Sequence, residues 1–322
     1  MSKRSHVMLP FSNYEKGKAM TVWTTPPYAD PTRFEEHDVT IGTGDRAVPG
    51  TLTRLATRSK VGVVLLSGSG PFDRDETSGP NKPLKDLAWG LASAGIAVLR
   101  FDKITHTRPD VMNEPGFTPH DEYGPHTIAA VQMLREHADQ VFLVGHSMGG
   151  KAAPRIAAED PSIAGIVIMA GDAQPMHEAA VRVMNYLATT NPEAIPPGTV
   201  ELFQRQAATV ASPDLSADTP ATELPFGMPG AYWLDIRDYD PVVTAAKLDL
   251  PILVLQGGRD YQVTVTDDLR GWRQGLPDAT IKVIDADNHL FFPGTGPSTL
   301  NDYATAQHVD PAAIAAILDW LP

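Results

Sequence analysis

The sequence predicts an α/β protein with a mostly parallel central sheet that is flanked by helices. Three observations lead to this prediction. Several short β-branched runs are apolar on both faces, as in parallel strands that helices cover on each side. Segments of helical periodicity separate these runs, and such alternation is typical of a parallel sheet with crossover helices. The alternation is broken once, between about residues 171 and 247, which indicates an insertion.

Each expected strand is bounded by Gly, Pro, Asp or Asn, which end extended segments. Pro154 lies inside an otherwise helical segment and predicts a kink or a short first helix there. The expected strands are 50–57, 61–67, 96–101, 141–144, 163–169 and 252–256, with weaker ones at 37–41 and 280–285. The expected helices are 83–94, 120–139, 148–158, 264–274 and 311–320.

The insertion begins with an amphipathic stretch at 176–189 and continues through Pro- and Thr-rich sequence. A segment of this size between two strands predicts a cap, or lid, over the carboxyl edge of the sheet. A packed helical decoration without a gating role is the alternative. We therefore divide the chain into an N-terminal extension (1–35), a core (36–172 and 246–322) and an inserted cap (173–245).

Composition excludes several kinds of protein. The 322 residues include no cysteine, which excludes a disulfide scaffold, a thiolate zinc site, an iron–sulfur cluster and a cysteine nucleophile. The formal net charge of −13 argues against nucleic acid as a partner, because a phosphate-binding surface needs clustered Lys and Arg. No apolar stretch is long enough to span a membrane, and the first residues lack the apolar core of a signal peptide. We expect a cytoplasmic protein without a membrane partner.

The sharpest motif is Gly145-His146-Ser147-Met148-Gly149. A buried strand precedes it, and an Ala-rich helical segment follows it. A sharp strand-to-helix turn of this kind holds a serine above the sheet at the positive end of a helix, with glycines that allow close backbone contacts. A capping serine in a tight turn is the alternative. We interpret Ser147 as a nucleophile.

A nucleophilic serine needs a base, and the base needs a carboxylate that orients it. On this architecture the acid and then the histidine follow the serine in the chain. Asp260 comes just after the strand 252–256, and His289 comes just after the weaker strand 280–285. Because the carboxyl ends of parallel strands meet at one edge of the sheet, these residues can converge on Ser147.

Alternatives exist for both partners. Asp172 follows the strand 163–169 and is the second choice for the acid, whereas Asp285 and Asp287 are too near His289 in sequence. His308 competes as the base but has no strand before it. His146 neighbours the serine, and we interpret it as a packing or loop-bonding residue.

An acyl-transfer site also needs donors for the oxyanion. The backbone N–H groups of Met148 and Ser69 are expected to supply them, since Gly68 and Gly70 let that loop approach a substrate. No histidine spacing matches a metal motif, and chemistry by a Ser-His-Asp triad needs no cofactor, so we expect neither a metal nor an organic cofactor. The residues that we assign to the substrate pocket are Gly68, Gly70, Phe226, Tyr232, Trp233 and Phe291, although ordinary core packing explains the aromatic ones nearly as well.

The sequence resembles the α/β-hydrolase superfamily, in particular bacterial serine esterases of the dienelactone-hydrolase-like branch. The resemblance covers most of residues 50–295. It implies a Ser147–Asp260–His289 triad, an oxyanion loop at Gly68–Gly70 and hydrolysis of carboxylic esters with short acyl chains. Dienelactone hydrolase itself uses a cysteine, so its own reaction is not implied. The stretches that carry the resemblance are LLSGSGPFDRDE, NKPLKDLAWGLASAGIAVLRFDK, VGHSMGG, LPFGMPGAYWLDIRDYDP and PILVLQGGRDYQVT with NHLF after it.

The leading hypothesis is therefore a cytoplasmic serine carboxylesterase that acts on a small-molecule ester. Acyl transfer, thioester hydrolysis and peptide hydrolysis use the same triad and are the enzymatic alternatives. A ligand-binding module on an inactive hydrolase fold is the non-enzymatic alternative. For the assembly we consider a homodimer.

Overall fold

The computed structural model describes residues 23–322. These residues form an eight-stranded sheet with the order β1-β2-β4-β3-β5-β6-β7-β8. β2 is antiparallel to both of its neighbours, and the other pairs are parallel, so that the sheet is mostly parallel, as predicted. The strands are β1 (Glu35–Ile41), β2 (Val48–Arg54), β3 (Ser59–Leu66), β4 (Ala97–Phe101), β5 (Ala138–His146), β6 (Ile163–Met169), β7 (Ile252–Gly257) and β8 (Thr280–Ile284).

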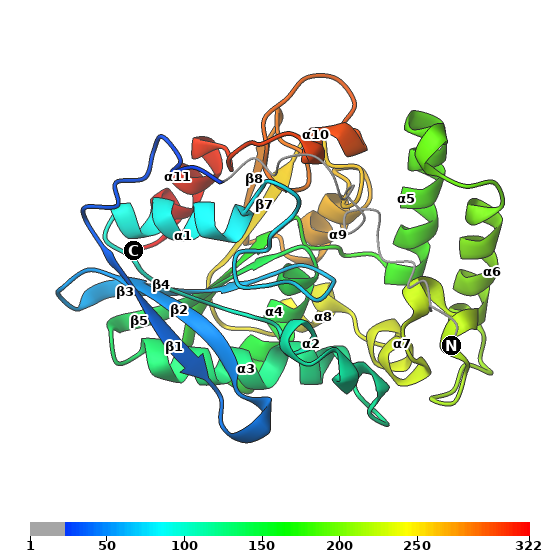
Figure 1. Cartoon of the computed structure of the whole chain (residues 1–322), viewed down its shortest axis with the longest axis horizontal. Coiled ribbons are helices and arrows are strands. Elements are labelled where there is room, and N and C mark those ends of the chain that lie inside the picture. Colours follow the sequence, from blue (N-terminus) through cyan, green and yellow to red (C-terminus); the bar gives the residue numbers. More distant parts are fainter. Residues whose placement is uncertain (1–22) are drawn as a thin grey trace.

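Helices cover both faces of this sheet, with α1 and α11 on one face and α3 and α4 on the other (Figure 1). The α-helices are α1 (Pro83–Ser93), α2 (Ile104–Thr107), α3 (Pro119–Leu134), α4 (Met148–Glu159), α5 (Met176–Thr190), α6 (Thr199–Ala211), α7 (Gly230–Arg237), α8 (Pro241–Ala245), α9 (Asp268–Gly275), α10 (Leu300–Ala304) and α11 (Pro311–Trp320). Short 3₁₀ helices lie at Gly44–Arg46, Pro109–Asn113, Pro192–Ala194, Ala221–Glu223 and Pro225–Gly227.

Two apolar cores lie on either side of the sheet, because successive side chains of a strand point to opposite faces. On β3, Val64 and Leu66 join the core beneath α3 and α4. Val63 and Leu65 join the core beneath α1 and α11. All four side chains are buried, which explains why this strand reads as a continuous apolar run.

The predicted helix at 120–139 is wrong at its carboxyl end. α3 ends at Leu134, and β5 begins at Ala138. Pairing with the neighbouring strand outweighs local helical preference there: Ser59 N–H donates to the His137 carbonyl, and the Arg58 guanidinium donates to the carbonyls of residues 135, 136 and 138.

The expected short first helix at Pro154 is also wrong, because α4 continues through this residue to Glu159. A proline removes one backbone hydrogen bond from a helix interior. α4 packs against β5, β6, α3 and α8, and this packing outweighs the loss.

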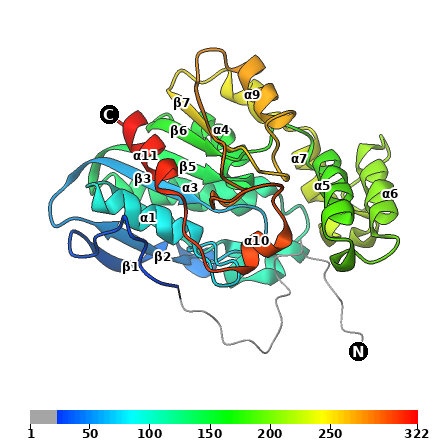
Figure 2. The ribbon, with the colours of Figure 1, turned by 90° about the horizontal axis from the view of Figure 1, so that it is seen from above.

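The inserted segment at 173–245 consists of α5 to α8 joined by irregular chain. α5 and α6 lie side by side, outside the layers of the core (Figures 1 and 2). α5 coincides with the amphipathic stretch predicted at 176–189. α8 returns the chain to the core, where it contacts α4 and α9.

The predicted N-terminal extension at 1–35 lies partly outside the described residues, which begin at 23. Residues 23–34 contain no helix or strand and run along α1. The Trp23 indole N–H donates to the Asp86 carboxylate at 2.7 Å, and the Asp30 N–H donates to the Ser93 hydroxyl at 2.8 Å. No helix among the described residues has the length and apolar character needed to cross a membrane.

Candidate active site

Ser147 lies in a strained turn between β5 and α4. Its φ is 52° and its ψ is −118°, a conformation that a non-glycine residue adopts only when the surroundings impose it. The surroundings are backbone: a Cβ at Gly145 would lie 2.3 Å from the Gly149 carbonyl oxygen, and one at Gly149 would lie 2.6 Å from the Leu66 carbonyl oxygen. Both glycines are therefore required for α4 to begin against the end of β3. The capping alternative is not supported, because the Ser147 side chain makes no capping hydrogen bond to α4.

His289 and Asp260 form a buried pair. The Nδ1 atom of His289 lies 2.8 Å from the Asp260 Oδ2 atom, and the Asp260 side chain is completely buried. The backbone N–H groups of Gln262 and Val263 donate to Asp260 Oδ1. The Gln256 side-chain amide donates to Oδ2. These bonds fix the carboxylate, which holds a proton on His289 Nδ1 and leaves Nε2 free to accept one.

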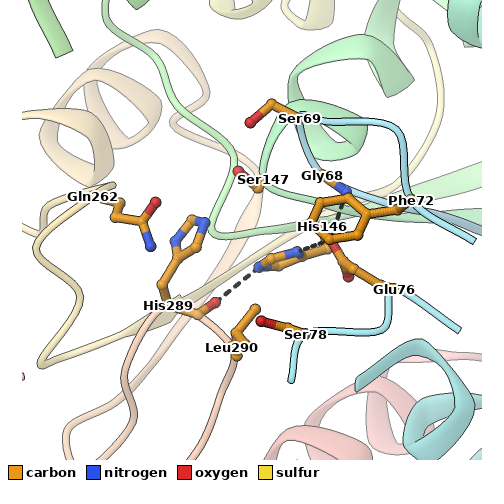
Figure 3. Close-up of a pocket in the computed structure, with 10 residues that line it drawn as sticks. All are labelled: Gly68, Ser69, Phe72, Glu76, Ser78, His146, Ser147, Gln262, His289 and Leu290. Carbon is orange, nitrogen blue, oxygen red and sulfur yellow. Dashed lines mark hydrogen bonds and ion pairs between the residues drawn. The ribbon is translucent and has the colours of Figure 1, made fainter. Parts of the chain in front are cut away.

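Ser147 and His289 both line the same two cavities. Figure 3 shows the His289 ring beside Ser147, with Gln262 next to the ring. The structure thus brings together the three residues that the sequence assigned to a triad, from the ends of β5, β7 and β8. A serine beside an imidazole that a carboxylate orients can carry out nucleophilic catalysis.

The alternative residues are engaged elsewhere. The Asp172 carboxylate accepts a hydrogen bond from the buried Lys151 ammonium at 2.8 Å. His308 contacts Asp86, far in sequence from the serine turn. Asp287 is buried in the loop of His289, but its carboxylate makes no hydrogen bond to that ring. Geometry therefore favours Asp260 and His289 over these alternatives.

The loop after β3 also lies beside Ser147. Ser69 lines both cavities, and Met148 lines one of them, together with Ser147. Within residues 23–322, the backbone N–H of neither Ser69 nor Met148 donates to a backbone carbonyl. The loop itself is held by Glu76, whose Oε1 atom accepts the Gly68 N–H at 2.6 Å. Two backbone donors are thus left over beside the serine, as an oxyanion hole requires.

His146 links this loop to the histidine loop. Its Nδ1 atom lies 2.9 Å from the Glu76 carboxylate, and its Nε2 atom lies 2.8 Å from the His289 carbonyl oxygen (Figure 3). Burial by itself lowers the pKa of His146, but the Glu76 carboxylate outweighs burial, so that the pKa is raised. The interpretation of His146 as a loop-bonding residue is confirmed. It ties both sides of the site together.

The two cavities have different walls. The first is lined by Gly68, Phe72, Ser78 and Leu290 and by parts of the serine and histidine loops. The second lies under α5 and is mainly apolar, because its walls include Met176, Ala179, Ala180, Val183, Met184 and Phe226. Residues of the inserted segment therefore form one wall of the space beside Ser147.

The predicted pocket residues divide into two groups. Gly68 and Phe226 line the cavities. Tyr232, Trp233 and Phe291 line neither cavity; they are buried, and ordinary packing accounts for their positions. Gly70 also lines neither, but its φ of 112° is a conformation that favours glycine in the turn of the loop.

Comparison with known proteins identifies the family. The model of the α/β hydrolase family matches residues 63–303. The chain belongs to the α/β hydrolase family. The resemblance inferred from the motifs is thereby confirmed. The chain is 35% identical to esterase EstD of Thermotoga maritima over 311 residues, which are 95% of this chain and 72% of that protein.

Two solved structures share the fold of this α/β hydrolase. Est1E from Butyrivibrio proteoclasticus has a TM-score of 0.53 at 15% identity, over 79% of this chain and 90% of the other. The proline iminopeptidase of Mycobacterium smegmatis has a TM-score of 0.54 at 17% identity, over 79% and 92%. At these identities the similarity establishes the architecture alone.

Several residues at the site of this hydrolase were missed in the sequence. Gln256 and Gln262 are neutral amides, and only the folded loops show that one supports Asp260 and the other lines both cavities. Glu76 carried a signal, since an acidic residue in a Gly-rich loop after a buried strand needs a partner when it is buried. Its partner, His146, lies 70 residues later and could not be read from spacing.

Asp287 gives this hydrolase a predicted pH dependence of stability. Burial and the neighbouring Asp310 carboxylate raise the pKa of Asp287 to about 8, and Arg259 acts in the opposite direction. In the unfolded chain the Asp287 carboxyl ionises near pH 4. The stability that its neutral form gives the folded protein is therefore complete below that pH and is lost as the pH rises to about 8. Asp287→Asn should remove this loss.

The measurement is the free energy of unfolding in urea between pH 4 and pH 8. The Asp287→Asn variant should gain stability relative to the wild-type protein as the pH rises through this window. Asp285→Asn, two residues away, serves as the matched control for replacing a carboxylate in this loop. A difference between Asp287→Asn and the original protein that stays constant with pH would contradict the assignment.

Proposed function

We propose that this α/β hydrolase is a serine carboxylesterase with Ser147 as nucleophile. One observation carries the proposal: the strained Ser147 shares its cavities with an imidazole whose Nδ1 atom lies 2.8 Å from a buried carboxylate. Two further observations support the proposal. Backbone N–H groups are left over beside the serine. The relative at 35% identity is named an esterase.

In the proposed reaction His289 Nε2 takes the proton of the Ser147 hydroxyl while the oxygen attacks the ester carbonyl. The N–H groups of Ser69 and Met148 stabilise the oxyanion that forms. When the tetrahedral intermediate collapses, the alcohol leaves with the proton from His289, and an acyl-enzyme remains. Water then attacks this ester while His289 accepts its proton. Collapse of the second intermediate releases the acid and restores Ser147. Asp260 stabilises the imidazolium in both halves. No cofactor enters these steps.

We further propose that residues 173–245 act as the cap of this site and that short acyl chains occupy the cavity under α5. Met176, Val183 and Met184 supply apolar walls near the serine. A small-molecule ester fits a cavity of this kind, in which a few polar groups set the orientation. The cytoplasmic location, the homodimer and the division of the N-terminal extension from the core stay predictions.

The test combines labelling with turnover. The purified protein should react with a fluorophosphonate probe, and peptide mass spectrometry should place the label on Ser147. It should hydrolyse aryl acetate and butyrate faster than long-chain aryl esters. Free acid should remain the main product when an alcohol or an amine is added, whereas acyl transfer would give the adduct. Thioesters and peptide amides should be poorer substrates. A protein that neither takes up the label nor hydrolyses any ester would refute the proposal and favour a ligand-binding module.

A further inference from the structure

The carbonyl of Gly68, at the start of the oxyanion loop, is bound by two buried side chains. The Lys103 Nζ atom lies 3.1 Å from this oxygen, and the Tyr123 hydroxyl donates to it at 2.8 Å. Lys103 also donates to the Tyr123 hydroxyl at 2.8 Å. The Gly68 carbonyl thus accepts a neutral and a charged hydrogen bond inside the protein.

Lys103 belongs to a buried network that extends to the inserted segment. It follows β4, and its ammonium lies 2.9 Å from the Glu122 carboxylate on α3. The Tyr232 hydroxyl on α7 donates to the other oxygen of Glu122 at 2.9 Å. Burial lowers the pKa of Lys103, and Glu122 opposes this shift. The side chains of Lys103 and Glu122 are 3% and 5% exposed, so a charge there acts with little screening.

The geometry of the peptide group connects this network to catalysis. The carbonyl of Gly68 and the N–H of Ser69 belong to one planar trans peptide, so the two bonds point in opposite directions. Donors that hold the carbonyl on one side therefore aim the N–H to the other side. Ser69 lines both cavities beside Ser147. A donor to the carbonyl also polarises the peptide and makes its N–H a stronger donor.

We propose that Lys103 and Tyr123 are positioning residues that aim and polarise the Ser69 N–H toward the oxyanion of the reaction. The inference rests on the proposed ester hydrolysis and adds to it the groups that activate one oxyanion donor. Neither residue touches the substrate. Glu122 pairs with the lysine and opposes the effect of burial on its pKa, and Tyr232 holds Glu122 from the inserted segment. Tyr232, which the sequence suggested as a pocket residue, thus acts through three successive contacts, to Glu122, then Lys103, then the Gly68 carbonyl.

The network should stabilise the transition state more than the bound ester, because the negative charge on the carbonyl oxygen develops only as the bond to Ser147 forms. Lys103→Met keeps the length of the side chain and removes its charge. We expect it to lower kcat for an aryl acetate by about 10- to 100-fold, with KM changed by less than about threefold. Tyr123→Phe removes only the hydroxyl and should lower kcat by roughly 3- to 10-fold.

The decisive readout is a transition-state analogue. A trifluoromethyl ketone forms a hemiketal with the serine, whose oxyanion occupies the same hole. Its inhibition constant should rise in each variant by about the factor by which kcat falls. Rates are expressed per active site titrated with the fluorophosphonate, so a partly unfolded preparation does not imitate the effect.

Tyr186→Phe is the matched control, because the Tyr186 hydroxyl also donates to a backbone carbonyl, that of Ser298, at 2.7 Å. It should leave kcat and the inhibition constant within about twofold. Unchanged kcat and inhibition constants in Lys103→Met would overturn the proposal. If that variant does not fold, Tyr123→Phe decides by the same criterion. Absence of labelling and turnover in the original protein would refute the proposed esterase activity instead.

Discussion

Ser147→Ala should lower kcat/KM for an aryl acetate by about 10⁴-fold or more. Alanine cannot form the acyl-enzyme, so only the oxyanion donors and the binding pocket would remain to assist attack by water. The residual rate should be that of a site that keeps its oxyanion donors but has no nucleophile. Steady-state kinetics with an aryl acetate measure it, and the fluorophosphonate should no longer label the protein.

Ser147→Gly separates the effect of the substitution on catalysis from its effect on stability. The φ of 52° at this position strains a side chain but not glycine. This variant should be as inactive as Ser147→Ala, yet its free energy of unfolding in urea should exceed that of the alanine variant by about 1 kcal/mol. Appreciable turnover by either variant would exclude Ser147 as the nucleophile.

Asp260→Asn should lower kcat by about 10³- to 10⁴-fold. An asparagine presents an amide N–H toward His289 Nδ1 if its oxygen keeps the backbone donors of Gln262 and Val263. The imidazole must then carry its proton on Nε2, where it can no longer accept the proton of Ser147. Steady-state kinetics at several pH values measure the loss.

Asp172→Asn is the comparison, because Asp172 also lies at the carboxyl end of a strand and lines the cavity under α5. It pairs with Lys151 and not with His289. Its replacement should lower kcat by less than about tenfold and should chiefly reduce stability, since it leaves a buried ammonium without its partner. A larger loss of kcat in Asp172→Asn than in Asp260→Asn would move the acid to Asp172.

The strands and the candidate triad could be read from the sequence because each follows a local pattern. The runs at 61–67 and 163–169 are apolar on both faces, and this pattern alone distinguishes a covered parallel strand. Ser147 has a motif, and His289 follows a strand. The segment at 135–139 was wrongly assigned to a helix, because its helical preference is local whereas its pairing partners on β3 lie 79 residues earlier in the chain.

The supporting network was hidden for the same reason. Lys103 and Glu122 lie on different elements, and their charges read as ordinary surface residues in the sequence. For Tyr232 and Trp233 the error was the opposite one: the sequence assigned them to the substrate pocket, whereas they are buried and line neither cavity. Aromatic character suits a pocket and a core equally well. Only burial and contacts separate these cases.

The order of residues along the chain determined the architecture and narrowed the candidates for a nucleophile and its partners, because periodicity and turn chemistry act over a few residues and parallel strands end at one edge. Tertiary structure decided which acid reaches His289, which walls surround Ser147 and what holds the oxyanion loop. Those choices depend on which side chains meet across distant segments at hydrogen-bonding distance and out of water. Electrostatic interactions are strong in such places, and the spacing of residues along the chain does not reveal them.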